Sequence, residues 1–436
     1  MTWPIVALKR LVDPVRAITY GILQAGPDTK GGIPYIRPVD MTTFNGVANP
    51  SSLLRTTQEI AQAYSRSTVK QGDVIISIGP SYGKVMILPA SLSGANLTQG
   101  TARVAPGAEA DGRYLYWALQ SEKSRQFWDS CVGGATFRAL NLEPLGRTPI
   151  PCPSMTNQRR IADFLDVETA RIDRLMALRR VQRANLEERA YATVSEVLLP
   201  GILAMPAQSW PWTWMPSMPS DRPLVRLGYV CRLQNGLTVD GNRDFSGDSV
   251  TRPYLRVANV QAGHLSLESV TEITVPRGIA TRTSLRPGDV LMTEGGDLNK
   301  LGRGAVWRGE IPECLHQNHV FALRPEIGRL DANYLALMTR TLHGRCYFES
   351  TGSKTTNLAS TNSSKILSFP IPLPSISVQR GLARQAQGAL DSGSAADRLL
   401  ERQLALLAER RQALITATVT GQFDVAAASG RGVDAS

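Results

Sequence analysis

The chain repeats itself at an offset of about 220 residues. Pro34-Tyr35-Ile36-Arg37 returns as Pro253-Tyr254-Leu255-Arg256, an offset of 219, and Gly72-Asp73-Val74 returns as Gly288-Asp289-Val290, an offset of 216. The proline-rich segments 149–153 and 370–374 are 221 residues apart, as are Gln158-Arg159 and Gln379-Arg380. Chance matches would scatter in offset, whereas these keep their order and spacing. The sequence therefore predicts a tandem duplication.

Each repeat ends in a stretch typical of one long helix. Residues 154–199 contain no Gly or Pro, begin beside hydroxyls that can cap free amides, and stop at Pro200-Gly201. The second stretch covers residues 375–420, with a possible kink predicted at Ser392-Gly393-Ser394. We expect the two helices to pair as an antiparallel coiled coil, a rod roughly 60 Å long at about 1.5 Å per residue. The residues predicted to form its apolar seam are Leu165, Ile172, Leu175, Leu186, Leu400, Leu404, Leu407 and Leu414.

What precedes each helix reads as a mixed α/β domain. Short apolar runs such as 74–78 and 84–88 are separated by Gly and Pro, and one helix is expected at 114–129. At 436 residues the chain fits two such domains plus helices. The predicted organisation is a first domain over 1–153, a helix over 154–200, a linker and second domain over 201–374, a helix over 375–424 and a flexible tail over 425–436.

Composition limits where the chain works and what it binds. No apolar run is long enough to span a bilayer and the N-terminus has no signal-peptide pattern, so we expect a cytoplasmic protein without membrane contact. The five cysteines form no C-x-x-C pair and are expected to be reduced. A net charge of +11 favours a polyanionic partner such as nucleic acid.

The residues of a catalytic site are missing from the sequence. Residues 79–85 resemble a phosphate-binding loop but are one residue short and have Val85 where a metal-binding hydroxyl belongs, so we interpret them as a turn between strands. No E-x-K tripeptide occurs, and Asn49-Pro50 lacks the Pro-aromatic pair of an amino-methylating site. We therefore expect no catalytic residues in this chain.

Cys314, His316 and His319 are the one group that resembles a zinc site. Residues 315–323 alternate like a single strand, on which side chains three apart point to opposite faces. We therefore predict no metal here, and a strand whose polar face reaches DNA.

Polar residues on glycine-rich loops, placed equivalently in the two repeats, are the candidates for DNA contact. Gly133-Gly134 opens one such loop and Gly352 the other. Glycine permits close approach, Arg and Lys pair with phosphate or guanine, and Asn or Gln can bind adenine. Ordinary solvated turns are the alternative for any single residue. The predicted DNA-binding residues are Arg37, Ser81, Tyr82, Lys84, Thr136, Arg138, Asn141, Arg256, Asn299, Lys300, Arg303, Gln317, Lys354, Thr355 and Asn357.

These features resemble the specificity subunits of type I restriction-modification systems. The shared pattern comprises Gly-Asp-Val in each repeat, an I-P-x-P segment followed by Gln-Arg and a long helix, and the terminal Val419-Thr420-Gly421-Gln422. The run Ala162-Asp163-Phe164-Leu165-Asp166 also fits, whereas Leu382-Ala383-Arg384-Gln385-Ala386 departs from it.

The resemblance implies two target-recognition domains that read a bipartite, asymmetric site on double-stranded DNA, with the helices acting as ruler and dock. It implies two modification subunits that methylate adenine, and in some systems restriction subunits that cleave. It also implies that this chain binds no cofactor, and that S-adenosylmethionine, ATP and Mg²⁺ belong to the partner subunits.

A stand-alone enzyme and a scaffold protein are the two alternative classes of function. A stand-alone enzyme would need converging titratable groups, and the sequence has four histidines and no paired acidic motif. A coiled-coil scaffold or adaptor without DNA sequence specificity is the stronger alternative. DNA binding would weaken steeply with salt, whereas a scaffold's affinity for its partner need not.

Overall fold

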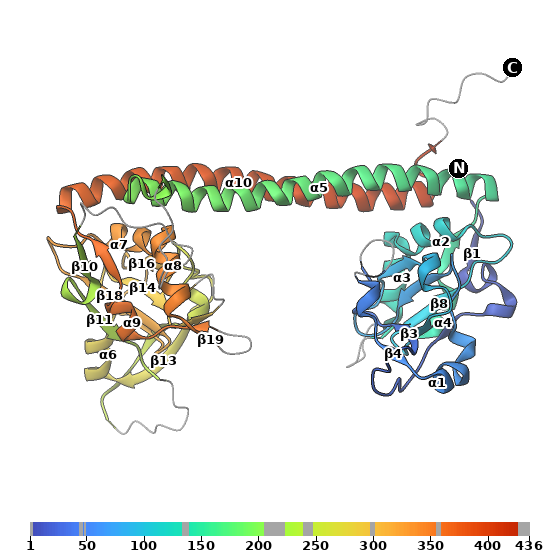
Figure 1. Ribbon diagram of the computed structural model, residues 1–436, viewed down its shortest axis with the longest axis horizontal. Coiled ribbons are helices and arrows are strands. Elements are labelled where there is room, and N and C mark those ends of the chain that lie inside the picture. The colour runs from blue at the N-terminus through green and yellow to red at the C-terminus, as the bar shows by residue number, and fades with distance from the viewer. Residues whose placement is uncertain are drawn as a thin grey trace, which may run out of the picture. The chain divides into compact units, whose positions relative to one another are not determined.

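The computed structural model describes residues 3–42, 47, 49–132, 139–204, 223–238, 247–296, 301–354 and 359–425. Its contacts divide the chain into two units, Met1–Arg179 with Glu401–Ser436 (unit 1) and Arg180–Leu400 (unit 2). Each unit joins a mixed α/β domain to parts of both long helices (Figure 1). Most of the predicted linker and the predicted tail, residues 205–222 and 426–436, lie outside the described residues.

The domain of unit 1 is built on two small sheets and one closing strand pair. The larger sheet is antiparallel, in the order β2 (Thr19–Tyr20), β8 (Thr101–Val104), β5 (Val74–Ser77) and β6 (Val85–Ile87). The second has the order β4 (Arg55–Thr56), β3 (Ile33–Ile36) and β7 (Asn96–Leu97), with β3 and β7 parallel. Near the chain start, β1 (Ile5–Ala7) pairs antiparallel with β9 (Pro149–Pro151).

Unit 2 repeats this topology strand for strand. Its larger sheet has the order β11 (Cys231–Asn235), β18 (Val320–Pro325), β14 (Val290–Thr293) and β16 (Gly304–Val306). Its second sheet has the order β13 (Thr271–Pro276), β12 (Ser249–Leu255) and β17 (Leu315–His316), again with one parallel pair, and β10 (Leu224–Arg226) pairs with β21 (Pro370–Pro372). One further sheet joins β15 (Gly295–Gly296), β20 (Ala359–Ser360) and β19 (Ser353–Lys354). The predicted duplication is confirmed at the level of the sheets.

Short helices complete both domains. Those of unit 1 are α1 (Gln58–Ala63), α2 (Gly112–Leu119), α3 (Glu122–Val132) and α4 (Leu142–Arg147). Those of unit 2 are α6 (Arg277–Thr283), α7 (Ala332–Met338), α8 (Leu342–Thr351) and α9 (Ser363–Leu367).

Each central strand separates two hydrophobic cores. Val74 and Ile76 of β5 belong to the core that also contains α2, whereas Ile75 belongs to the core on the other face of the sheet. In unit 2, Val290 and Leu291 of β14 divide in the same way. Side chains alternate across a strand, so a continuous apolar run is required where both faces are covered.

Two local predictions are wrong. The single helix expected over 114–129 is two helices, α2 and α3, because the chain turns at Gln120-Ser121. The single strand expected over 315–323 is β17 followed by β18 in a different sheet, with Val320 N donating to Gln317 O across the intervening turn. The turn predicted between β5 and β6 is confirmed.

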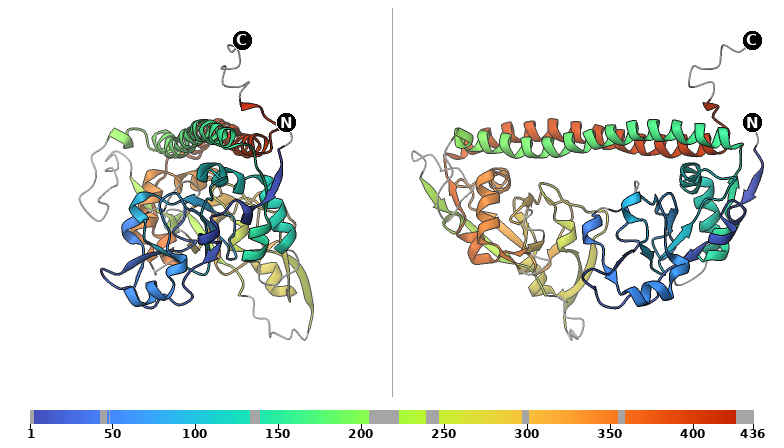
Figure 2. Two further views of the ribbon diagram at one scale, coloured as in Figure 1. Left: turned by 90° about the vertical axis from the view of Figure 1, so that its right-hand side faces the viewer. Right: turned by 45° about the vertical axis from the view of Figure 1, so that its right-hand side comes forward.

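The long helices are α5 (Met155–Leu198) and α10 (Ile376–Val419), which run antiparallel and side by side within each unit (Figures 1 and 2). In unit 1, Arg411 of α10 lies 2.9 Å from Asp173 of α5. In unit 2, Arg183 of α5 lies 2.7 Å from Asp397 of α10, and this hydrogen-bonded ion pair lowers the pKa of Asp397. The predicted antiparallel pairing is therefore observed in both units.

The apolar seam was predicted only in part. Leu165 and Ile172 are buried and Leu186, Leu400, Leu404, Leu407 and Leu414 are partly buried, but Leu175 is 43% exposed. Leu175 is thus wrongly placed in the seam. The expected kink at Ser392-Gly393-Ser394 is also wrong, since α10 passes through these residues without a break. Among the described residues, no helix is both long enough and apolar enough to cross a bilayer.

One glycine in each repeat allows the two sheets of its domain to approach closely. A Cβ on Gly21 would lie 1.8 Å from the carbonyl oxygen of Leu97, and a Cβ on Gly236 would lie 2.1 Å from that of Gln317. Each glycine precedes a parallel bridge to the second sheet, Ile22 to Thr98 and Leu237 to Gln317. Only glycine fits at this contact, because backbone atoms cannot move aside cheaply.

We expect Gly21→Ala and Gly236→Ala each to destabilise the protein by about 1–3 kcal/mol or more, the usual cost of overpacking a core. Gly388→Ala is the matched control: its Cβ would meet no atom within 4 Å on an exposed helix, so it should stabilise by about 0.5–1 kcal/mol. Urea unfolding followed by tryptophan fluorescence measures all three. Equal stability of Gly21→Ala and Gly388→Ala would contradict the assigned contact.

Candidate nucleic-acid interface

The polar loops of unit 1 converge around the turn between β5 and β6. Ile78 N donates to Gly100 O at 2.8 Å, and Leu140 N donates to Ile78 O at 2.8 Å. From the same turn, Lys84 Nζ donates to Pro38 O at 3.2 Å and the Tyr82 hydroxyl donates to Asp129 at 2.6 Å. Segments distant in sequence are thereby held at one end of the sheet.

Unit 2 assembles the corresponding loops around Glu294, which follows β14. Glu294 N donates to His319 O at 2.9 Å, and Thr361 N donates to Glu294 O at 2.8 Å. Gln317 N donates to Leu255 O at 2.9 Å, which places the turn at 317–319 beside Arg256. The strand pairs β15–β20 and β19–β20 bring Lys354 to the same group of loops.

The structure brings together most of the predicted DNA-binding residues that it describes. Ser81, Asn141 and Arg256 are exposed, whereas Tyr82, Lys84 and Gln317 are partly buried. Arg37 is held by Asp40, and this hydrogen-bonded ion pair raises the pKa of the arginine. The predicted residues Thr136, Arg138, Asn299, Lys300, Thr355 and Asn357, and the side chain of Lys354, lie outside the described part of the chain. DNA contact by all of these residues stays a prediction.

Arg303 differs from its predicted role as a DNA-facing residue. Its guanidinium lies over the ring of Tyr191 on α5, 5.0 Å from the ring centre, and Arg345 approaches the same ring at 5.6 Å. Guanidinium groups stack favourably on aromatic faces. Arg303 therefore packs its domain against a long helix.

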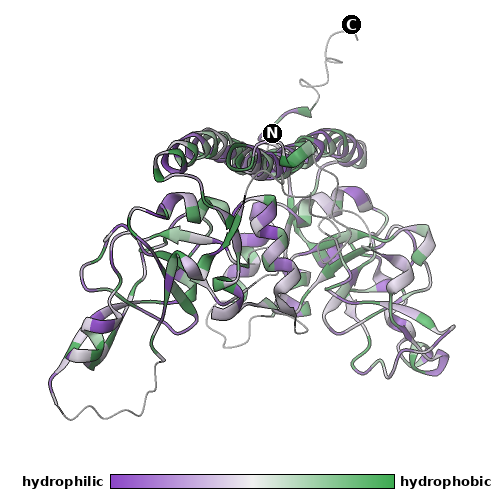
Figure 3. Ribbon diagram, turned by 60° about the vertical axis from the view of Figure 1, so that its left-hand side comes forward, coloured by the Kyte–Doolittle hydropathy of each residue, from purple (hydrophilic) through white to green (hydrophobic). Residues whose placement is uncertain are grey.

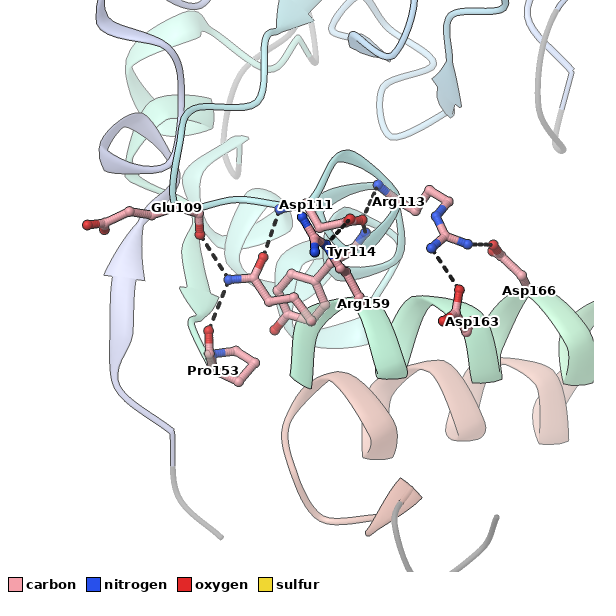
Figure 4. A network of polar contacts seen from close by, with 9 residues as sticks. Glu109, Asp111, Arg113, Tyr114, Pro153, Arg159, Asp163 and Asp166 are labelled. Carbon is pink, nitrogen blue, oxygen red and sulfur yellow. Dashed lines mark hydrogen bonds and ion pairs between the residues drawn. The ribbon is translucent and has the colours of Figure 1, made fainter. Parts of the chain in front are cut away.

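A buried glutamine anchors each domain to the helix that follows it. In unit 1 the Gln158 side chain accepts a hydrogen bond from Asp111 N at 2.9 Å and donates to Glu109 O and Pro153 O, each at 3.0 Å. Figure 4 shows Glu109, Asp111 and Pro153 surrounding this position at the start of α5. The anchor joins the loop before α2 to the entry of α5.

Gln379 makes the same three contacts in unit 2. It accepts from Asp331 N at 2.9 Å and donates to Arg329 O at 2.9 Å and Pro374 O at 2.8 Å. Both glutamines are fully buried. We call this arrangement the glutamine clamp. The sequence contained the Gln-Arg pair as a repeated motif, but the motif did not reveal that its glutamine is structural.

Each domain is also held by the other long helix. The Thr416 hydroxyl of α10 accepts from Glu122 N at the start of α3, at 3.0 Å, and the Ser195 hydroxyl of α5 accepts from Leu342 N at the start of α8, at 2.7 Å. These hydroxyls satisfy an amide at a helix start that would otherwise lack a partner. Two helices thus fix the orientation of each domain.

The histidines near these loops are engaged within the protein. Among the described residues, no three His, Cys, Asp or Glu side chains gather as metal ligands. His316 is buried, with its Nδ1 2.7 Å from Val320 O, and His319 pairs with Glu294.

Comparison with known proteins relates part of the chain to one family. Residues 22–182 match the family model described as type I restriction modification DNA specificity domain. The type I restriction enzyme EcoBI specificity subunit of Escherichia coli is 26% identical over 160 residues, covering 36% of this chain and 33% of that protein. The MjaIX specificity subunit of Methanocaldococcus jannaschii is 21% identical over 237 residues, covering 53% and 52%. The alignments therefore span between a third and about half of these relatives.

One solved structure shares the fold over nearly the whole chain. It was determined in a study of complex assembly and conformational transition of the type I R-M system, and it matches with a TM-score of 0.70 at 20% identity, covering 97% of this chain and 98% of the other. Residues 22–182 therefore resemble a type I restriction-modification DNA specificity domain, and the chain is similar in sequence to specificity subunits of that class. The similar proteins are specificity subunits, as the resemblance in the sequence implied.

The glutamine clamp generates a stability prediction. We expect Gln158→Met to destabilise the protein by about 2–5 kcal/mol, because methionine fills the space but leaves Asp111 N, Glu109 O and Pro153 O without partners, at about 1–3 kcal/mol for each unsatisfied buried group. The control is Gln403→Met at an exposed position of α10, which should change stability by less than about 0.5 kcal/mol. Urea unfolding decides, and equal effects of the two changes would refute the clamp.

Acid should weaken unit 2 before unit 1. All four histidines lie in unit 2, and burial lowers the pKa of His316 and His343. Below about pH 6.5 the histidines of the unfolded chain bind protons that the buried histidines of the folded chain do not. The free energy of unfolding therefore decreases as the pH is lowered, by up to about 1.4 kcal/mol per pH unit for each histidine. Hydrogen exchange in mild urea, corrected for intrinsic rates, should show protection lost in α7 but kept in α2 between pH 7.0 and 5.5. Parallel loss in both helices would contradict this.

Proposed function

We propose that this chain is the DNA-reading subunit of a type I restriction-modification complex, and that each unit reads one half of a bipartite, asymmetric site on double-stranded DNA. The convergence of polar loops at the same place in both units carries the proposal. Reading of base edges needs side chains held at fixed positions. Each group of loops here is built on a sheet whose domain is clamped to two helices.

Positive charge and loop chemistry support DNA as the ligand. The chain carries 48 Lys and Arg against 37 Asp and Glu, and such an excess supplies the sequence-independent part of DNA affinity. In unit 1, Lys84 lies among the converging loops with Ser81 and Asn141, and in unit 2, Arg256 lies among them with Gln317. The lysine and arginine suit phosphate contact, and the serine, asparagine and glutamine suit base contact.

The long helices supply the surface on which partner subunits dock. In unit 1, Val167, Leu175, Leu178 and Leu406 are between 43% and 66% exposed, and in unit 2, Val181 and Leu399 are 57% and 63% exposed. The ribbon coloured by hydropathy shows hydrophobic residues among hydrophilic ones along both helices (Figure 3). Such residues on a helix surface favour a protein partner. We assign this role to two modification subunits and, in systems that have one, a restriction subunit.

The catalytic chemistry belongs to those partners. S-adenosylmethionine would bind to the modification subunits, and ATP and Mg²⁺ would act on the partner subunits that use them. This chain would contribute DNA sequence recognition and would work in the cytoplasm, where its DNA target lies. The alternative, a coiled-coil scaffold without sequence specificity, would hold the same partners without setting where they methylate.

Separable half-sites test the proposal. We expect Asn141→Ala to relax one position in one half of the methylated motif, and Arg256→Ala to affect only the other half. Loss of a base contact costs about 1–3 kcal/mol of discrimination, whereas loss of a phosphate contact weakens all sites alike. Methylation mapping by long-read sequencing, in cells expressing the chain with its modification subunit, measures both.

The control is Arg398→Ala, which removes an exposed arginine from α10 and should leave the motif unchanged. A motif that changes in both halves on a single substitution would exclude two independent readers. A methylation pattern insensitive to any substitution in these loops would favour the scaffold.

A further inference from the structure

The surface beside the glutamine clamp differs in charge between the two units. In unit 1, Arg113 at the start of α2 donates to Asp163 at 2.7 Å and to Asp166 at 2.9 Å, both on α5 (Figure 4). Trp117 Nε1 also donates to Asp166, at 2.8 Å. Carboxylates of the chain itself therefore close the gap between domain and helix.

Unit 2 lacks these carboxylates at the equivalent positions. By the offsets of the duplication, Asn333 replaces Arg113, Arg384 replaces Asp163 and Gln387 replaces Asp166. Arg308 enters from the end of β16, and its guanidinium donates to Asn333 Oδ1 at 3.1 Å. Within the described part of the chain, no hydrogen bond or ion pair engages Arg384.

The result is an arginine-lined groove between α7, α10 and the end of β16. It has a volume of about 580 Å³ and is lined by Arg308, Arg380 and Arg384 together with Asp331, Asn333 and Gln387. Asp331 is the one acid of this lining, and it is already engaged: it accepts from Asn333 N and Tyr334 N and lies 3.5 Å from Arg380. The groove therefore carries an excess of positive charge.

A second cavity continues this groove. Its volume is about 280 Å³ and it shares Arg308, Asn333 and Gln387 with the groove. Its walls combine apolar residues such as Leu265, Val306 and Leu337 with the polar residues His264, Glu310 and Arg340. A ligand that fills both parts presents carboxylate or phosphate groups to the arginines of the groove and a group of mixed polarity to the cavity.

We propose that this groove binds an acidic segment of a protein partner, with carboxylates on Arg308 and Arg384 and a neighbouring side chain of the segment in the cavity. Planar guanidinium groups match carboxylates in a bidentate geometry. The equivalent place in unit 1 is filled by carboxylates, Asp163 and Asp166, so carboxylates fit this location in the fold. The contact exists in unit 2 alone, because Arg113 of unit 1 is already paired.

The identity of the partner rests on the proposed function, which makes the modification subunit the first protein to test. Binding of that purified subunit to the full-length chain is measured by biolayer interferometry, and binding of a target duplex by fluorescence anisotropy. For R308E/R384E we expect at least a tenfold weaker affinity for the subunit, with duplex affinity changed less than twofold. K9E/R10E reverses two exposed basic residues of unit 1 that lie outside the groove and outside both long helices, and it should change each affinity less than twofold.

A second variant keeps the positive charge at position 384, so its result does not depend on whether the fold tolerates a reversed charge there. In R384K, carbodiimide treatment of the complex joins the new amine to a carboxylate of the partner as an amide, with water lost overall and the carbodiimide converted to its urea. We expect a cross-linked peptide that contains position 384 and an Asp or Glu of the modification subunit. Cross-links at other lysines without one at position 384 would overturn the proposal.

The results distinguish failure of the proposed function from failure of the groove assignment alone. If the unaltered chain binds neither the subunit nor the duplex, the proposed function fails and the groove assignment with it. If the unaltered chain binds the subunit and R308E/R384E binds it equally well, only the groove assignment is wrong. Loss of duplex affinity with retained subunit affinity would show that phosphate occupies the groove, which also overturns the proposal.

Discussion

The structure depends on one buried amide in each repeat. A glutamine side chain both donates and accepts, so a single residue can satisfy one backbone N–H and two carbonyl groups at the crowded junction between a domain and its helix. Glutamate of the same shape lacks the donors, and methionine lacks both functions. The clamp also fixes direction, because its partners lie on the segment before α2 or α7 and on the segment that enters α5 or α10.

This anchor explains why so little of the helix pair needs to be apolar. Each domain packs on the first turns of one long helix and the last turns of the other, where Ile161, Leu165, Ile415 and Val419 are buried in unit 1. Phe423, which follows the turn at Gly421, stacks on Phe164 at 5.3 Å. Further along, ion pairs such as Arg411–Asp173 and Arg183–Asp397 join the helices. The core residues that the long helices contribute to unit 1 thus lie near the helix ends, whereas Leu175, further along α5, is 43% exposed.

Sequence alone predicted the features that repeat. The duplication, the mixed α/β domains, the ends of both long helices and their antiparallel pairing follow from motif spacing and from Gly and Pro positions. It failed where a residue distant in sequence determines the local structure. The break at Gln120-Ser121 is one case, since Thr416 of α10 caps the start of α3 there. The sequence also contained no sign that Arg303, predicted to contact DNA, lies over the ring of Tyr191 on α5.

The buried aspartate at the start of the central strand is paired with an arginine in both repeats, but the arginine comes from a different element in each. Asp73 and Asp289 are both buried at the start of the central strand and both bind a backbone amide three residues before them. Asp289 is paired with Arg324 of β18, but the equivalent Arg103 of β8 donates instead to the carbonyls of Arg66, Thr68 and Ala17, and Arg16 pairs with Asp73. A buried carboxylate must be paired, yet the fold does not dictate which element supplies the cation. The glutamine clamp and the buried aspartate are therefore present in both repeats. The residues around them differ between the repeats, so the same fold has a different surface in each unit.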